Sequence, residues 1–438
     1  MHTFKILPLV SAKVVCRLIC IRVGPARILP NQPGPTYQKG KDQTNKQTNR
    51  EELWTTDREV ATMTTAAPRR LKGHTATATC CIASRDRPGT VATAGEDGRV
   101  CWFDMRCEQV QTVMEIGEQP ISCLCFKPGN EDIVYISSGS VVNGFDMRMA
   151  SPLKPLKSYK YNREEVNQIA CNFKGDFLAS ADDSGDVKII DIRQDCPYKT
   201  LRAGHTSICS SVQFVPWRPW EVITGGLDSK MVIWDFSRGR PVKTVDFGSP
   251  DTPNAHSAAQ CLNPAFVHAI AVPDSDMIDK SGKICAVARG DGVVNVISIE
   301  NELAASRSKG SSKSRKGSHS TSNDREAVAD VSDPSQVAGG RLRLDYELGG
   351  LCASVSCVAF SLFGEKGKFL ISGGNDKLVK VWDYTRYSNA GLTGYNEGVL
   401  HASISLSKKV NWLCTTPNES ENLVVCDTTK VVKVYSVM

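Results

Sequence analysis

The sequence predicts an all-β fold in which seven four-stranded antiparallel sheets close into a ring. A block of residues recurs along the chain, and its apolar runs are short, bounded by Gly, Pro, Asp or Asn, and regularly spaced, as strands are and helices are not. The 438 residues are 41% hydrophobic and 23% charged, which is an ordinary globular composition. This composition excludes a wholly disordered chain, a fibrous rod and a polytopic membrane protein.

The recurring block leads from small or Ser/Thr residues at a strand end, through an acidic tight turn, to an alternating apolar strand that ends in an aromatic residue and Asp. Its clearest copies are ITGGLDSKMVIWDF at 223–236 and ISGGNDKLVKVWDY at 371–384. Seven copies occur, and their terminal position is filled by Asp104, Asp146, Asp191, Asp235, Ser298, Asp383 and Ser436. Successive copies are 42, 45, 44, 63, 85 and 53 residues apart, so the last three intervals carry insertions.

A second pattern, V-x-x-V-x-F-x-P or a variant of it, lies upstream in each block and predicts a further strand. The final block offers only three strands after Lys408. We therefore expect residues 67–73 (APRRLKG) to supply its fourth strand and so join the two chain ends. On this interpretation residues 1–62 are dispensable for the fold.

A period of about 40 to 45 residues with Trp-Asp endings resembles the WD-repeat family of β-propellers. The resemblance covers about residues 67–438 and implies a seven-bladed WD40 propeller. A narrower resemblance to one branch of the family is carried by segments such as LNPAFVHAIAV at 262–272 and KVNWL at 409–413.

The resemblance implies a buried hydrogen-bond chain in the fourth block that links an indole, a hydroxyl, an imidazole and a turn carboxylate. Its members are Trp234, Thr224, His205 and Asp228, and the first block offers a variant with His74, Thr93 and Asp97. A Ser/Thr, His, Asp set could also suggest a catalytic triad, but a buried chain in a tight turn lies far from any cleft nucleophile. The sequence also lacks a Gly-rich phosphate loop, a nucleophile elbow and metal-spaced ligands, so we predict no enzymatic activity and no cofactor.

A possible binding feature lies two residues beyond the strand-terminal Asp of the first three blocks. The pairs are Asp104 with Arg106, Asp146 with Arg148, and Asp191 with Arg193. This Asp-x-Arg ending is similar to the one with which WD proteins that act as substrate receptors dock on the adaptor of the cullin-4 RING ubiquitin ligase. Phe or Ile replaces the usual Trp, and the turn of the 177–193 copy is one residue longer. Each Arg could alternatively pair only with its neighbouring Asp.

The net charge of +6 is concentrated in two segments. Residues 1–50 carry +8 and residues 304–320 carry +5, which leaves minus 7 on the rest of the chain. We expect residues 1–66 to be a disordered basic extension, with a start at Met63 or a targeting segment as alternatives, and residues 303–340 to be a flexible Ser/Lys/Arg-rich loop. The mildly acidic ring argues against a nucleic-acid binder, and no apolar run is long enough to span a membrane.

The 17 cysteines show no zinc or disulfide spacing and favour a reducing compartment, so we expect a cytoplasmic or nuclear protein. Cys80, Cys81, Cys123, Cys125, Cys171, Cys357, Cys414 and Cys426 are predicted to be small buried hydrophobes.

Together these features predict a monomeric ring that serves as a non-catalytic protein-interaction scaffold. Its predicted partners are the cullin-4 adaptor and an unidentified substrate, bound at the opposite face or the channel mouth. The alternative is a scaffold of another complex, such as a chromatin or RNA-processing assembly, with no ubiquitin-ligase role.

Overall fold

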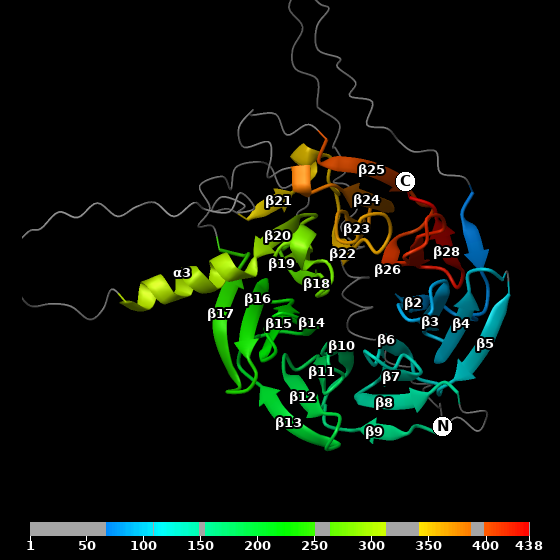
Figure 1. The fold of residues 1–438 in the computed structure, drawn as a ribbon, viewed down its shortest axis with the longest axis horizontal. Helices are drawn as coiled ribbons and strands as arrows, with labels where there is room; N and C mark the ends of the chain where they lie inside the picture. The colour runs from blue at the N-terminus through cyan, green and yellow to red at the C-terminus, as the bar shows by residue number, and fades with distance from the viewer. Residues whose placement is uncertain are drawn as a thin grey trace, which may run out of the picture.

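The computed structural model describes residues 67–107, 109–148, 154–249, 263–311, 341–386 and 398–437, with side chains described only as far as residue 305 in the fourth range. These residues form seven four-stranded antiparallel sheets around a central axis (Figure 1). The predicted seven-bladed all-β ring is therefore confirmed. Residues 1–66 lie outside the described residues, and so does most of the predicted loop at 303–340.

The blades are numbered 1 to 7 in the order of their innermost strands. Blade 1 consists of β2 (Ala78–Ala83), β3 (Thr90–Gly95), β4 (Arg99–Asp104) and β5 (Val110–Glu115). Blade 2 consists of β6 (Ile121–Phe126), β7 (Ile133–Ser138), β8 (Val141–Asp146) and β9 (Lys157–Tyr159). Blade 3 consists of β10 (Val166–Cys171), β11 (Phe177–Asp182), β12 (Val187–Asp191) and β13 (Cys196–Leu201). Blade 4 consists of β14 (Cys209–Phe214), β15 (Glu221–Gly226), β16 (Lys230–Asp235) and β17 (Arg240–Asp246).

Blade 5 consists of β18 (Val267–Ala271), β19 (Ile284–Arg289), β20 (Val294–Ser298) and β21 (Leu342–Leu344). Blade 6 consists of β22 (Val355–Phe360), β23 (Leu370–Gly374), β24 (Leu378–Trp382) and β25 (Leu400–Ser405). Blade 7 consists of β26 (Val410–Thr415), β27 (Leu423–Asp427), β28 (Val432–Tyr435) and β1 (Arg69–Leu71). Helical segments in the described part of the chain include α2 (Ile278–Ser281), α3 (Ile299–Ser311) and the 3-10 turn η1 (Tyr346–Leu348).

The two faces of the ring follow from the antiparallel order within each blade. The loops that join the first strand to the second, and the third to the fourth, lie on one face, which we call the lower face. The remaining loops lie on the upper face. Because the recurring Asp ends or directly follows the third strand, it marks the lower face in blades 1, 2, 3, 4 and 6.

The core is divided among the interfaces between blades. Alternate side chains of each sheet face the two neighbouring blades, as the period of two in a strand requires. Seven apolar clusters result, one at each interface. Trp234 packs between blades 3 and 4, and Trp382 between blades 5 and 6, both almost fully buried. A blade therefore has no independent core and depends on both neighbours.

The ring is closed by pairing of the two chain ends, as expected. Strand β1 lies antiparallel to β28, with Arg69 opposite Val434 and Leu71 opposite Val432 (Figure 1). Leu71 is 1% exposed and packs in the cluster between blades 7 and 1. The fourth strand of the last blade thus comes from the segment that precedes blade 1.

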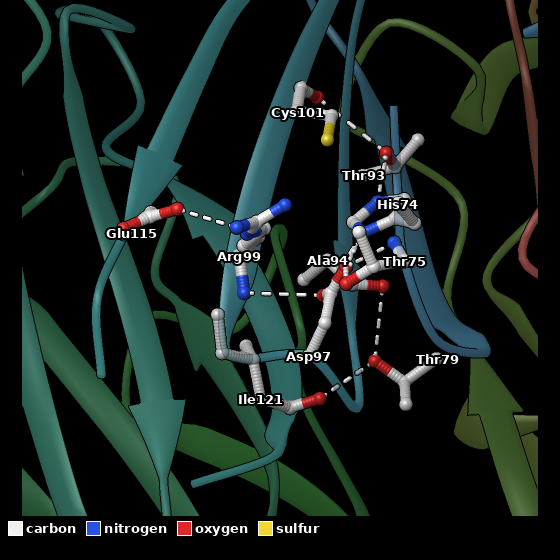
Figure 2. Close-up of polar contacts among 10 residues, drawn as sticks. All are labelled: His74, Thr75, Thr79, Thr93, Ala94, Asp97, Arg99, Cys101, Glu115 and Ile121. Carbon is white, nitrogen blue, oxygen red and sulfur yellow. Dashed lines mark hydrogen bonds and ion pairs between the residues drawn. The ribbon is translucent and has the colours of Figure 1, made fainter. Parts of the chain in front are cut away.

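A polar residue sits at a bulge in the innermost strand of every blade. The strand register shifts at Thr79, Ser122, Asn167, Ser210, His268, Ser356 and Asn411. Thr79 Oγ1 donates to the carbonyl of Ile121 in blade 2 at 2.6 Å (Figure 2). Ser356 Oγ donates to Val410 in blade 7 at 2.7 Å, and Asn411 Nδ2 donates to Ala78 in blade 1 at 3.3 Å. Ser122, Asn167 and Ser210 reach the next blade in the same way.

The start of the predicted loop at 303–340 differs from expectation. Helix α3 occupies Ile299–Ser311, so the first residues of that range are helical. Leu303 is 4% exposed in the cluster between blades 4 and 5, and Glu302 pairs with Arg341 at 2.7 Å. These contacts fix the first turns of the helix against the ring.

The predicted buried cysteines divide into two groups. Cys80, Cys81, Cys123, Cys357 and Cys426 are buried. Cys125, Cys171 and Cys414 are only half-buried, which corrects the prediction for them; they lie at the lower ends of the innermost strands β6, β10 and β26. All cysteines within the described ranges have free thiols.

Removing β1 tests how much the closure contributes. A chain that starts at Met63 should unfold at the same urea concentration as the full chain. A chain that starts at Lys72 loses the β1–β28 pairing and the buried Leu71, whose truncation to Ala alone should cost about 2–5 kcal/mol. Equal urea midpoints for the chains starting at Met63 and Lys72 would contradict the closure.

The bulge hydrogen bonds can be tested in blade 6. Ser356→Ala removes the bonds to Val410 and to Gly373, the latter 3.0 Å long, and leaves buried carbonyls without this donor. The unfolding free energy should fall by roughly 1–3 kcal/mol. Ser405→Ala, on the exposed end of the outermost strand of the same blade, is the control and should change it by less than about 0.5 kcal/mol.

Candidate functional site

The three Asp-x-Arg pairs lie in consecutive blades on the lower face. In each, the Asp ends the third strand and the Arg begins the turn to the fourth. The side chains of Arg106, Arg148 and Arg193 are 83%, 65% and 64% exposed. The three arginines thus occupy equivalent backbone positions in three consecutive blades.

The arginines of blades 1 and 2 are held by their own aspartates. Arg106 Nε donates to Asp104 Oδ1 at 2.9 Å and Nη2 to Oδ2 at 2.5 Å. Arg148 forms the same fork with Asp146, at 3.0 and 2.6 Å. The hydrogen bonds from these arginines lower the pKa of Asp104 and of Asp146 to about 2. The neighbour-pairing alternative therefore describes these two pairs, although both arginines stay largely exposed.

Blade 3 departs from this geometry. Asp191 Oδ1 accepts the backbone amides of Arg193 and Gln194, at 2.9 and 3.0 Å. The guanidinium of Arg193 instead lies 3.5 Å from Asp176, in the loop between the first two strands. Arg193 is thus the least tightly held of the three.

Two further arginines on the same rim escaped the sequence analysis. Arg238 in blade 4 lies 3.5 Å from Asp235, and Arg386 in blade 6 donates to Asp383 at 3.0 Å. Each follows its Asp by three residues rather than two. A search for Asp-x-x-Arg beside Asp-x-Arg would have found them.

Neighbouring blades are linked by charge beneath this rim. Asp132, in the first loop of blade 2, contacts Arg87 of blade 1 at 3.1 Å and Arg148 of its own blade at 3.6 Å. Glu131 accepts the backbone amides of Arg85 and Asp86 in blade 1. The arc across blades 1 and 2 is therefore fixed by contacts outside the forks.

An ion pair crosses the lower mouth of the central channel. Arg85 lies in the first loop of blade 1 and Asp274 in the first loop of blade 5, and their side chains pair. These blades are not neighbours in the ring, so the contact spans the axis. The Arg85–Asp274 pair therefore partly covers the lower mouth.

The four side chains of the predicted hydrogen-bond chain are brought together in blade 4. Trp234 Nε1 donates to Thr224 Oγ1 at 2.9 Å, and Thr224 lies 2.7 Å from His205 Nε2. His205 Nδ1 lies 3.0 Å from Asp228 Oδ1. The His205 and Thr224 side chains are buried, so this set of residues ties the upper turn to the strands and faces no cleft.

Blade 1 contains the shorter version (Figure 2). His74 Nε2 lies 2.8 Å from Thr93 Oγ1, and His74 Nδ1 lies 3.1 Å from Asp97. Phe103, which stands where blade 4 has the indole, cannot donate to the hydroxyl. Gly95 is required beside this cluster, because a Cβ there would lie 2.8 Å from the His74 ring nitrogen.

Other blades use different side chains for the same task. In blade 3, Asn162 accepts from Ser180 at 2.8 Å and donates to Asp182 at 3.0 Å. In blade 5, Arg289 pairs with Asp291 of the turn and donates to Asn295 at 2.8 Å. Sequence analysis missed both, because neither resembles a His-Thr-Asp set.

The described residues contain neither a metal-binding cluster nor a membrane-spanning helix. No group of three or more His, Cys, Asp or Glu side chains there is placed to hold a metal ion. Nor does any helix of that part of the chain have the length and apolarity to cross a membrane.

The fork of blade 1 makes a prediction about pH. Since Arg106 lowers the pKa of Asp104 in the folded chain below its unfolded value, the pair contributes stability above about pH 4 and loses it as the pH falls toward 2. Arg106→Gln should move the pKa of Asp104 up toward its usual range, as followed by NMR of ¹³C-labelled carboxyl groups. Asp146, whose partner is untouched, serves as the control and should keep a pKa of about 2.

Comparisons with known proteins agree with this architecture. The family described as WD domain, G-beta repeat matches residues 67–104, 153–191, 196–235 and 346–383. WD repeat-containing protein 53 homolog of Dictyostelium discoideum is 24% identical over 391 residues, which cover 84% of this chain and 94% of that protein. THO complex subunit 3 of Arabidopsis thaliana is 29% identical over 167 residues, which cover 38% of this chain and 51% of that protein.

Among solved structures, the WD40 beta propeller domain of Doa1 matches with a TM-score of 0.59 at 16% identity, covering 85% of this chain and 97% of its own. That likeness concerns the fold. The matched stretches 67–104 and 196–235 each run from the fourth strand of one blade to the third strand of the next, the same offset that leaves β1 to close the ring. The chain is therefore a seven-bladed β-propeller in which four stretches match the WD domain, G-beta repeat family, and it is similar over most of its length to the WD repeat-containing protein 53 homolog.

Proposed function

We propose that this propeller is a non-catalytic interaction scaffold that docks on the adaptor of a cullin-4 RING ubiquitin ligase through Arg106, Arg148 and Arg193. Asp104 and Asp146 position the first two guanidinium groups, and Asp191 holds the backbone of the turn that carries Arg193. The partner groups are carboxylates, which a guanidinium can bind through paired hydrogen bonds.

One observation supports this proposal above the others. Three consecutive blades carry an exposed Arg at the same point of the lower rim, two residues after the strand-terminal Asp. In blades 1 and 2, the guanidinium is also fixed by a two-point fork. A side chain fixed before binding loses less conformational entropy when a partner arrives, so the forks favour docking as well as local stability.

The forks with Asp use only some of the N–H donors of Arg106 and Arg148. In Arg106 and Arg148 the bonds to Asp engage Nε and Nη2, while Nη1 belongs to neither fork. A partner carboxylate could therefore bind the outward edge of the guanidinium while the internal pair persists. Self-pairing and docking are compatible on this geometry.

The substrate would bind a surface that the adaptor does not cover. The strut between Arg85 and Asp274 crosses the lower channel mouth, on the face assigned to the adaptor. We therefore place the substrate at the upper face or the upper mouth of the channel.

The alternative is a scaffold of another assembly, without a ligase role. The partial similarity to THO complex subunit 3 favours this class, although it covers only 38% of the chain. On this alternative the rim arginines would contact a different acidic partner. A list of co-purifying proteins distinguishes the two.

The proposal is tested by co-purification from cells. The tagged full chain should recover the cullin-4 adaptor, and Arg106→Ala, Arg148→Ala and Arg193→Ala together should reduce recovery at least tenfold, which corresponds to roughly 1.4 kcal/mol of lost binding free energy. A folded triple variant that recovers the adaptor as well as wild type would exclude these residues, and a wild type that recovers none would exclude the ligase role.

The same rim offers a matched control. Arg238→Ala with Arg386→Ala removes two arginines that also pair with a strand-end Asp but follow it by three residues. This variant should retain most of the recovery. An equal loss in the control would mean that total rim charge, rather than the Asp-x-Arg geometry, attracts the partner.

A further inference from the structure

A hollow opens on the outer rim of the ring at the seam between blade 7 and blade 1. Its volume is about 810 Å³. The lining residues come from the β1 segment, from the turn after β4 with the start of β5, and from the loop that precedes β27: Arg69, Arg70, Lys72, Arg106, Gln109, Val110 and Glu421. The site therefore exists only when β1 has closed the ring.

The charge of this hollow is strongly one-sided. Its described lining carries four cationic side chains and one carboxylate. Glu421 is already paired with Arg69 at 2.7 Å, and Arg106 with Asp104 at 2.5 Å. After these two pairs are counted, Arg70 and Lys72 supply the excess positive charge. Glu108, which lies next to Gln109 in the sequence, is outside the described residues.

The positions of Arg70 and Lys72 follow from the strand. Leu71 between them is buried in the core, so its two neighbours turn to the opposite side of β1 and are exposed. Residues i and i+2 of a strand lie roughly 6.6 Å apart on the same side. This spacing equals that of alternate side chains in an extended peptide.

The remaining walls are held in place. The guanidinium of Arg69 donates to the carbonyls of Met105 and Cys107, so it fastens the turn of blade 1 to the strand of blade 7. Its side chain is only 21% exposed and has a structural role. The 83% exposed Arg106 projects from the same turn. Fixed walls and exposed charged ends together suit a ligand that is bound mainly through charge.

We propose that this seam hollow binds an extended acidic peptide, with carboxylates at alternate positions facing Arg70 and Lys72 and a further one reaching Arg106. A nucleic acid fits less well, because no aromatic side chain on which a base could stack is among the described lining residues. The inference does not depend on adaptor docking, since Arg70 and Lys72 are not part of the Asp-x-Arg arc.

The test measures binding of a fluorescein-labelled octapeptide of alternating Glu and Ser to the full chain by fluorescence anisotropy. Exposed charge pairs are individually weak, so Arg70→Gln with Lys72→Gln should weaken binding about two- to thirtyfold. Arg70→Lys with Lys72→Arg keeps both charges and should bind like wild type. Thermal unfolding midpoints of all variants show whether β1 still closes the ring.

The basic segment 1–50 provides the matched control. Lys39→Gln with Lys41→Gln removes the same charge from that segment and should change the affinity less than twofold. A larger loss there than in the seam variant would overturn the proposal, as would unchanged binding by a folded seam variant.

Two further ligands, tested in competition with the Glu peptide, show which kind of anionic group the hollow prefers. A Ser octapeptide bearing one phosphoserine that binds more tightly, and still requires Arg70 and Lys72, would support the site and identify phosphate as its preferred source of charge. Single-stranded DNA that displaces the Glu peptide and binds more tightly through the same two residues would overturn the peptide assignment. Recovery of the ligase adaptor by the seam variant is scored separately, so either proposal can fail alone.

Discussion

The ring depends on a polar residue placed at a bulge in the innermost strand of each blade. A bulge re-aims one side chain, and in six of the seven blades it turns a hydroxyl or amide toward the next blade, whereas blade 5 has His268 at this position. Thr79 reaches Ile121 in blade 2, and Asn411 reaches back to Ala78 in blade 1. These buried carbonyls are satisfied only when the neighbouring blade is present, and an unsatisfied one would cost about 1–3 kcal/mol. The hydrogen bonds thus oppose partial rings, while the apolar interfaces supply most of the attraction between blades.

Different blades hold the turns of the upper face with different side chains, and the pKa of the turn carboxylate shifts in different directions as a result. In blade 4, burial alone would raise the pKa of Asp228, but His205 and the amides of Thr206 and Lys230 together lower it. In blade 6, the turn residue Asp376 accepts the Cys352 amide at 3.0 Å, and burial raises its pKa. Raising the pH through the acidic range therefore strengthens the folded state through Asp228 and weakens it through Asp376.

The features that could be predicted from the sequence are those that recur in every copy of the repeated block. Seven blocks, each ending with an apolar strand, predict seven blades, and the missing fourth strand of the last block predicts that 67–73 pairs with it. The positions of the rim arginines followed from the same repeat. The side-chain orientations did not follow from the repeat, because they depend on contacts from other loops. Asp191 Oδ1 accepts two backbone amides, and the guanidinium of Arg193 lies near Asp176 of the first loop in blade 3. The role of Arg289 in blade 5 could not be predicted from the sequence. Arg289 contacts the turn carboxylate as His205 does in blade 4, but it differs from His205 in residue type and lies in a strand of its own blade.

The seam links the closure of the ring to its surface chemistry. Strand β1 has to bury Leu71, and the period of two then exposes both of its neighbours on the same side. Exposed positions on an outermost strand are often charged, since charge prevents pairing with another chain. In this chain the charges are Arg70 and Lys72, and the closure brings them beside Arg106, the first member of the Asp-x-Arg arc. The charges that protect this edge strand thereby extend the row of arginines across the junction of the two chain ends, so the two proposed binding surfaces meet at Arg106.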